Sequence, residues 1–560
     1  MKKLFLSIIS LALAGGAYAQ LNTFSDGDTI SAEKMNQNFQ ALVNSNLVRK
    51  TSIDCDAGET INGAIGQGFN DITISGTCNE NLYFLEWDYS AKTNVDPLIP
   101  PRYLKITGKD STSKIIDATS NEKDVITLRG GATILLKDLI ISGGANGLSV
   151  GRNANLLISG VTVENFVNYG ISVFDSSYLG VDSNGVIISG GTGAQRGIHM
   201  NTGSSGWVHT SNISNVETGI NNWADKLLLY NFTIEASQRG INLGDHSTVV
   251  RYLDGNGVIK GTSDCAINAD RGNFYSWGPG SLTIQNLQGG EAIEYGKSYG
   301  YIENLKMNNF TGNSSGDDAI IIRNGSSVEL QSAEISGAVD GHLIKVEDSS
   351  IAKIEKSTIT ITNGEGGLYV RGTSRLRIDD SAITGTVNDN LVNIEDGSSA
   401  KIRESTITAT TDGNFESGIY LSETSTLELR ESKIDASHRG LAVQRNSYAE
   451  LRNGSSITAG GANSAVTVYG GAGLKIRSGS SVVSTGASAI DVSQSSWVEI
   501  DGGDGSTINR TDDGDDISVS TMGLLSVYSG NSIGTVSCSS KGYVSASEGS
   551  VTTLPDSCTQ

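Results

Sequence analysis

The chain has 560 residues and a formal net charge of −21, with 69 glycines but only five prolines and five cysteines. Glycine and the other apolar residues together make up about half of the chain, which is enough to bury a core and excludes disorder along the whole length. The low proline content excludes collagen, and the acidic balance argues against a nucleic-acid partner, which a basic surface would bind.

Residues 1–19 are predicted to be a secretory signal peptide. Lys2 and Lys3 precede a short apolar run, and Ala17-Tyr18-Ala19 supplies the small residues of a cleavage site. This run is too short to cross a bilayer, and the sequence holds no later apolar run long enough to do so. We therefore expect a secreted protein without a membrane span, in the periplasm, at the cell surface or outside the cell.

Residues 20–50 form a separate segment with one apolar helical stripe, which includes Phe24, Ile30, Met35 and Phe39. Two interpretations stay open. The helix docks on the domain that follows, or it associates with a second copy to make a homo-oligomer.

The cysteines agree with export to an oxidising compartment. Cys55 and Cys78 lie 23 residues apart near the start of the folded region, and Cys538 and Cys558 lie 20 apart near its end. Each pair is predicted to form a disulfide. Cys265 is left over and is predicted to be a small packed residue.

A repeat dominates the sequence. Ile359, Ile383, Ile407, Ile434 and Ile457 recur at spacings of 24, 24, 27 and 23 residues. Each is followed by a second apolar alternation, a polar turn and a third short strand. This period indicates a stacked all-β solenoid of about 17 coils, because one coil cannot bury its own apolar face. The motif of leucine-rich repeats is absent.

The first coils carry a family resemblance. Ile53-Asp54-Cys55 reads as a strand, and Ile61, Ala64 and Ile65 share one helical face that covers the open end. The strands at 72–78 and 104–108 continue the pattern. This arrangement resembles the right-handed parallel β-helix, pectate-lyase-like superfamily. It implies a cap and first coils over residues 51–130 and a solenoid with a C-terminal disulfide cap over 131–560. The fold hosts enzymes and adhesins alike, so it implies no single activity.

One outward row of side chains is the first candidate site. Ile171, Ile198, Ile241 and Ile293 are predicted to point inward, and the residues after them outward. Aromatic side chains beside amides and charges suit sugar rings. We expect a glycan-contacting groove across residues 196–301, formed by His199, Asn201, Trp207, Trp223, Asn242, Asp270, Trp277 and Tyr295. The alternative is an ordinary stacked polar ladder.

A second candidate is Gly316-Asp317-Asp318 with His342 about one coil later. This motif resembles part of the polygalacturonase pattern, which implies Asp317 and Asp318 as the acid and base and His342 as an auxiliary. The Asn-Thr-Asp element expected one coil earlier is missing, and Gly-Asp-Asp also suits a turn. Lyase chemistry would instead need a basic side chain such as Arg271.

A third candidate is the acidic segment containing Asp501, Asp504, Asp513 and Asp515. Oxygen-rich flexible loops bind calcium, although a solvated acidic turn is the alternative. Taken together, the sequence predicts an exported rod that binds a polysaccharide or cell-surface glycan, or serves a structural role, without turnover. The alternative is a polysaccharide lyase or glycoside hydrolase acting on an acidic polymer.

Overall fold

The computed structural model describes residues 48–84, 103–251, 255–287, 289–311, 318–411, 417–501, 505–512, 514–547 and 550–558. The predicted signal peptide and all but the last residues of segment 20–50 lie outside them. The described chain is almost entirely β-strand, and it divides into two compact units. Unit 1 is Met1–Val216 with Leu227–Asn231, and unit 2 is Glu217–Lys226 with Phe232–Gln560.

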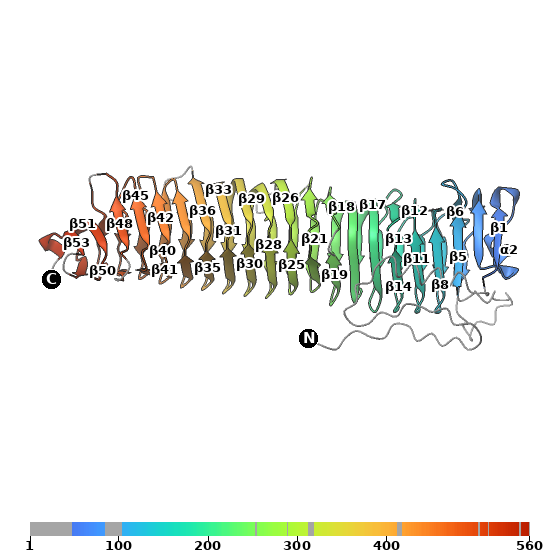
Figure 1. Ribbon diagram of the computed structural model, residues 1–560, viewed down its shortest axis with the longest axis horizontal. Helices are drawn as coiled ribbons and strands as arrows, with labels where there is room; N and C mark the ends of the chain where they lie inside the picture. Colours follow the sequence, from blue (N-terminus) through green and yellow to red (C-terminus); the bar gives the residue numbers. More distant parts are fainter. Residues whose placement is uncertain are drawn as a thin grey trace. The chain divides into compact units, whose positions relative to one another are not determined.

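Within each unit the strands of successive coils stack side by side (Figure 1), and their pairings define three parallel sheets, called A, B and C here. In unit 1, sheet A holds β4 (Leu82–Phe84), β7 (Ile126–Leu128), β10 (Asn146–Val150), β13 (Tyr169–Val173) and β16 (Arg196–Met200). Sheet B holds β1 (Lys50–Asp54), β2 (Asp71–Ser75), β5 (Tyr103–Gly108), β8 (Thr133–Lys137), β11 (Asn155–Ser159), β14 (Tyr178–Val181) and the start of β17 (Ser205–Asn222). Sheet C holds β3 (Thr77–Asn79), β6 (Lys114–Ile116), β9 (Ile140–Ser142), β12 (Val161–Glu164), β15 (Val186–Ser189) and a later part of β17.

Unit 2 has the same three-sheet pattern within itself, and several of its long strands run from sheet C into sheet A. Its sheet A holds parts of β18 (Lys226–Leu243), β29 (Glu334–Val346), β31 (Thr358–Val370) and β51 (Ser532–Cys538), with β21 (Cys265–Asp270), β24 (Glu291–Gly296), β27 (Ile320–Arg323), β34 (Val392–Ile394), β37 (Ser417–Leu421), β40 (Arg439–Gln444), β43 (Val466–Tyr469), β46 (Ile490–Val492) and β49 (Ile517–Val519). Sheet B holds β19 (Thr248–Arg251), β22 (Asn273–Ser276), β25 (Tyr299–Glu303), β28 (Ser327–Gln331), β30 (Ile351–Glu355), β32 (Arg375–Asp379), β35 (Ser399–Arg403), β38 (Thr426–Arg430), β41 (Tyr448–Arg452), β44 (Gly473–Ile476), β47 (Trp497–Ile500), β50 (Leu524–Val527) and β52 (Tyr543–Ala546). Sheet C holds the other parts of those long strands with β20 (Gly257–Lys260), β23 (Leu282–Gln285), β26 (Leu305–Thr311), β33 (Ala382–Val387), β36 (Thr406–Thr411), β39 (Lys433–Ala436), β42 (Ser456–Ala459), β45 (Ser481–Ser484), β48 (Thr507–Arg510) and β53 (Val551–Thr553).

The core consists of apolar columns that run from coil to coil. The five isoleucines of the repeat, from Ile359 to Ile457, pair in register from β31 to β42, and each is fully buried. Side chains alternate inward and outward along each strand, so one column of apolar residues faces the lumen of each sheet. The predicted fold, a right-handed parallel β-helix, is therefore confirmed.

The number of coils is larger than expected, at about 19 turns rather than 17. The count from the sequence began near residue 131, where the repeat becomes regular. The strands β1, β2 and β5 already pair in parallel register with one another and with β8. These irregular early coils contain insertions between strands, which hide their period in the sequence.

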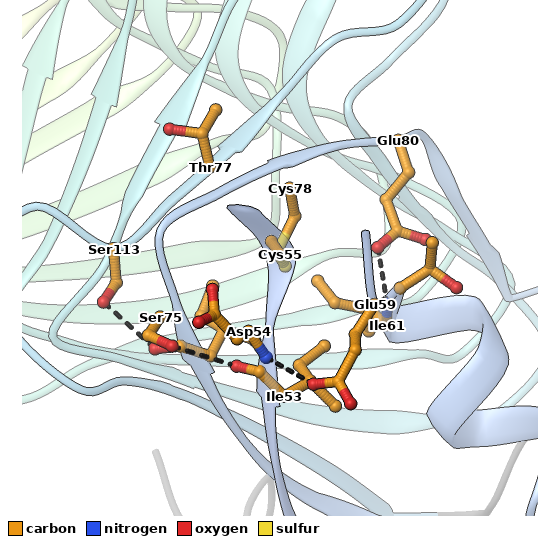
Figure 2. Close-up of a disulfide and its surroundings, with 12 residues drawn as sticks. Ile53, Asp54, Cys55, Glu59, Ile61, Ser75, Thr77, Cys78, Glu80 and Ser113 are labelled. Carbon is orange, nitrogen blue, oxygen red and sulfur yellow. Dashed lines mark hydrogen bonds between the residues drawn. A yellow bond between two sulfur atoms is a disulfide. The ribbon is translucent and has the colours of Figure 1, made fainter. Parts of the chain in front are cut away.

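The N-terminal end is closed as the apolar pattern predicts. Helix α2 (Ile61–Gly66) buries Ile61, Ala64 and Ile65 and packs against β1 and β2. The Glu80 carboxylate accepts a hydrogen bond from the Ile61 amide at 2.5 Å, which satisfies a free N–H in the first turn (Figure 2). No helix in the part of the chain described by the structure is long and apolar enough to cross a membrane.

Both predicted disulfides are present. Cys55 and Cys78 lie beside α2, with 4.9 Å between their Cα atoms (Figure 2). Cys538 and Cys558 join β51 to the last described turn, with 5.3 Å between Cα atoms. Cys265 is buried, as expected, and burial raises the pKa of its thiol well above the ordinary value, so it stays a protonated packing residue.

Candidate functional site

The groove expected over residues 196–301 falls in both compact units, so its two parts are described separately. In unit 1, His199 follows Ser172 in the outward row of sheet A, and its ring lies 4.9 Å from that of Tyr169. Asn201 is exposed in the turn after β16, where its side chain accepts a hydrogen bond from the Thr202 amide. These two residues are accessible, as predicted.

Trp207 does not offer the flat face expected of a residue that stacks on sugar. It points outward in register with Gly180, but its side chain is only 7% exposed. The rings of His209 and Tyr230 lie against it, with centroids 6.0 and 5.8 Å away. The alternation along a strand determines the direction of a side chain but not what packs over it, so this part of the prediction is wrong.

In unit 2, Trp223 and Trp277 are exposed at 47% and 40%, but Trp277 and Asn242 lie at different sheets. Trp277 follows β22 of sheet B and sits beside Tyr275, whereas Asn242 lies in the outward row of sheet A. Asp270 is exposed at the end of β21. The cluster seen in the sequence is dispersed in space because each coil passes through three sheets.

Tyr295 is enclosed, contrary to the expectation that it contacts glycan. It lies two residues after the inward Ile293 on β24 and is therefore inward itself, with 0% exposure. Gly300 of the next strand leaves room for the ring, since a Cβ there would lie 2.5 Å from it. The period of two, applied one step further, would have placed this side chain in the core.

The strongest polar cluster lies further along sheet A, around Asp318. One carboxylate oxygen accepts the His342 amide N–H at 2.7 Å and lies 3.3 Å from His342 Nδ1. The other lies 3.0 Å from Lys345 Nζ. The structure thus brings together Asp318 and His342, both named from the sequence, and adds Lys345, which the sequence did not single out. Asp317 lies outside the described residues, and Arg271 pairs with Asp245 instead of contacting this cluster.

The Asp318 carboxylate is buried and contacts two neighbouring side chains. Its side chain is only 4% exposed. Burial alone would raise its pKa, but the hydrogen bonds from His342 and the charge of Lys345 outweigh burial and hold the pKa below the ordinary value. The Asp318 carboxylate therefore contacts both His342 and Lys345 from a buried position, and its role as an acid or base stays a prediction.

The cluster continues over the next two coils. The His342 ring stacks on Tyr369 with 4.6 Å between centroids, and the Tyr369 hydroxyl donates to Glu395 at 2.8 Å. Arg371 donates to Glu347 from two nitrogens, at 2.9 and 2.7 Å. We call this set the charged row; it consists of Asp318, His342, Lys345, Glu347, Tyr369, Arg371 and Glu395.

The charged row leads into an open groove of about 580 Å³ on the same sheet. We call it the polar groove; it is lined by Asp389, Asn390, Asn393, Glu395, Tyr420, Arg439, Gln444, Arg445, Thr467, Tyr469 and Asp491. Its floor follows the outward positions Asn393, Tyr420, Ala442 and Thr467, which pair in register. Burial raises the pKa of Asp491 above its ordinary value, although the nearby charge of Arg439 opposes this shift.

These residues were missed because no motif marks them. The strands Leu368-Tyr369-Val370 and Ile419-Tyr420-Leu421 were recognisable from the repeat, and their middle residues had to point outward. Reading the middle position of every such strand in order would have listed the floor of the polar groove. The spacing of aromatic and histidine residues along the chain directed attention to an earlier segment instead.

The calcium site stays a prediction. Asp504 and Asp513 lie outside the described residues. Asp501 lies 3.6 Å from Lys475, and Asp515 is half-buried near Arg510. Within the ranges that the structure describes, no group of three or more histidine, cysteine or acidic side chains is placed to hold a metal ion.

The fold defines the class of this protein as a right-handed parallel β-helix. Residues 291–503 match the family model described as a right-handed beta helix region, and this segment contains both the charged row and the polar groove. No curated protein matches the chain.

Among solved structures, the PL6 family alginate lyase AlyGC is similar at 10% sequence identity and a TM-score of 0.23. The match covers 90% of this chain and 100% of that chain. A TM-score this low supports no inference about the activity of the chain.

Proposed function

We propose that this protein is an exported β-helix that binds an extended polysaccharide along sheet A of unit 2 without cleaving it. The observation that carries the proposal is the polar groove, which combines tyrosine rings, side-chain amides and paired charges on one open surface. Amides and paired charges hydrogen-bond to sugar hydroxyls, and tyrosine faces pack on the C–H faces of sugar rings. The two disulfides fit an oxidising compartment outside the cytoplasm.

The regular spacing of the coils supports an extended ligand. Tyr420 on β37 and Tyr469 on β43 both line the polar groove, and only β40 lies between their strands. Successive strands are about 4.8 Å apart, which separates the strands of the two tyrosines by roughly 10 Å. This distance is close to the length of a disaccharide, so a linear polymer can present equivalent sugars to both rings. A compact ligand would gain nothing from this repetition.

The charged row favours a second candidate, a polysaccharide lyase or hydrolase. His342, Lys345 and Arg371 lie close together, and such groups can neutralise a uronate carboxylate and accept a proton. However, Lys345 is held by Asp318 and Arg371 by Glu347, so both cations are already paired within the protein. We therefore place this row at the binding surface, where it orders the end of the polar groove.

The test is an incubation of the mature protein with acidic and neutral polysaccharides, followed by measurement of binding, new reducing ends and unsaturated uronate. Binding without product is expected, and product formation would replace the proposal by the enzymatic candidate. The variant Tyr420→Ala is expected to weaken binding about tenfold, by analogy with the loss of a stacked aromatic. Tyr528→Ala is the matched control, because Tyr528 is 48% exposed and lies outside the groove. Equal binding by the two variants would overturn the assignment of the groove.

A further inference from the structure

A second depression lies on sheet B of unit 2, on strands β30 to β41. In the outward column of these strands, Arg375, Ser399, Thr426 and Tyr448 are neighbours in register. Ser399 and Thr426 are small, whereas Arg375 and Tyr448 are large, so the surface is hollow between them. The hollow has a volume of about 470 Å³. We call it the basic trough; its outward polar lining is Arg375, Arg377, Ser399, Lys401, Thr426, Glu428, Tyr448 and Glu450.

The trough carries an excess of positive charge in a chain whose net charge is −21. The lining residues and their ion-pair partners comprise five cations, Arg375, Arg377, Lys401, Arg452 and Arg477, against three carboxylates, Asp379, Glu428 and Glu450. A local excess of this sign in an acidic protein attracts an anionic group to this face.

The two carboxylates of the lining are already neutralised. Glu428 lies 2.7 Å from Lys401 and 2.6 Å from Arg452, and Glu450 pairs with Arg477. Burial would raise the pKa of Glu428, but its two cationic neighbours hold it below the ordinary value. These carboxylates therefore do not repel an anion strongly at neutral pH.

Arg375 is the free cation of the trough. Its side chain is exposed, and it forms no ion pair with any residue that the structure describes. Arg377 lies two residues further along β32 and points to the same side of the sheet, where it contacts Asp379. β32 thus presents two guanidinium groups, of which that of Arg375 is unpaired among the described residues. Such a pair suits a carboxylate or sulfate, because an arginine can bind either group with two parallel hydrogen bonds.

The other end of the trough is aromatic. Trp497 lies two coils after Tyr448 in the same column, with Gly473 between them. The indole lies over Gly473, where a Cβ would come within 2.4 Å of the ring, and its centroid is 5.8 Å from that of Tyr448. Glycine thus allows the two rings to form one continuous aromatic wall at the end of the trough.

We propose that the basic trough binds an anionic oligosaccharide, with the carboxylate or sulfate of one sugar unit on Arg375 and Arg377 and the ring of a neighbouring unit against Tyr448, three strands further along the column. This site is on a different sheet from the polar groove, so it goes beyond the proposed function and does not depend on it. An anionic saccharide satisfies both ends of the trough, whereas a simple anion would use only the arginines and a neutral sugar only the aromatic wall.

The experiment measures the binding of three oligosaccharides of equal length to the full mature chain by calorimetry: one uronate, one sulfated and one neutral. Either anionic oligosaccharide is expected to bind, and the one that binds identifies the group. The variant Arg375→Gln is expected to weaken that binding about tenfold, which corresponds to the loss of one charge-assisted contact. Arg430→Gln is the matched control, because Arg430 is exposed on the same sheet but pairs with Glu431 outside the trough.

Three results would overturn the assignment: no binding of either anionic oligosaccharide, equal binding of the neutral one, or equal weakening by both arginine substitutions. Tyr420→Ala in the polar groove separates the two sites. If it alone abolishes binding of the anionic oligosaccharide while Arg375→Gln has no effect, the ligand occupies sheet A and the trough proposal fails. If Arg375→Gln alone weakens binding, the trough is supported whatever the fate of the polar groove.

Discussion

A column of buried serines gives the sharpest test of how the coils are held together. In unit 2 the backbone N–H of Ser326 donates to the hydroxyl oxygen of Ser350, and that of Ser350 to Ser374, each at 3.1 Å. Ser374 donates in the same way to Ser398. These serines are essentially inaccessible to water, so each hydroxyl supplies an acceptor that solvent cannot replace.

Replacing Ser374 by alanine leaves the Ser350 N–H without its acceptor. A buried polar group that loses its only partner costs about 1–3 kcal/mol. Ser425 lies in the same column and is also fully buried, but its hydroxyl has no hydrogen-bond partner among the described residues. Ser425→Ala therefore removes an unsatisfied group, and we expect it to be neutral or slightly stabilising. The two variants delete the same atom from equivalent positions, so their difference isolates the hydrogen bond.

Hydrogen exchange is the suitable assay, because a solenoid opens coil by coil and a single unfolding midpoint averages over many coils. We expect the Ser350 amide to exchange roughly 5–150-fold faster in Ser374→Ala than in the wild type, which corresponds to about 1–3 kcal/mol. Ser425→Ala is expected to leave the amides around it unchanged. If the Ser350 amide exchanged at the same rate in Ser374→Ala as in Ser425→Ala, the view that the serine column couples neighbouring coils would be refuted.

Three further predictions concern the site, the aromatic wall and the C-terminal end. Asp318→Asn is expected to destabilise its coil by about 1–3 kcal/mol at neutral pH, because it removes the charged acceptor of His342 and Lys345 and leaves Lys345 only the more distant Glu347 at 3.8 Å. The pKa of Asp318 in the folded protein is lowered from the ordinary value of 3.8. The stabilisation by its ionised carboxylate is therefore fully present above the ordinary pKa and is lost as the pH falls through the folded pKa. Thermal unfolding of the wild type measured against pH will show this loss. Gly473→Ala is expected to push the Trp497 indole away from Tyr448 and change tryptophan fluorescence, with little effect on the distant charged row. Replacement of Cys538 and Cys558 by serine removes their disulfide. We expect this to lower the free energy of unfolding of the last coils by about 3 kcal/mol and to make them accessible to limited proteolysis.

Each of these predictions has a result that contradicts it. An Asp318→Asn variant whose stability falls with acid as steeply as the wild type would show that this carboxylate does not titrate as described. Unchanged fluorescence in Gly473→Ala would mean that the indole does not rest on Gly473. If the cysteine variant resists proteolysis at its C-terminal end, the last coils are held by packing alone.

The architecture could be predicted from the sequence because it is written in local periodicity. Alternation places Ile359 inside and its neighbours outside, and the near-constant spacing to Ile383 and Ile407 stacks equal positions of successive coils. The same local rules predicted α2 and the inward position of Ile293. The irregular coils before residue 131 escaped the count because insertions break that spacing.

The candidate sites depended on tertiary structure, because a site in a β-helix is assembled across coils rather than along the chain. Trp277 and Asn242 are 35 residues apart and lie at different sheets, whereas Tyr369 and Tyr420 are 51 residues apart and occupy one column. Whether an outward ring is open, as for Trp223, or covered, as for Trp207, depends on what packs over it, and no local pattern records that. The sequence by itself therefore determined the coil and the direction of each side chain, and only the stacking of coils decided which side chains meet at the polar groove and the basic trough.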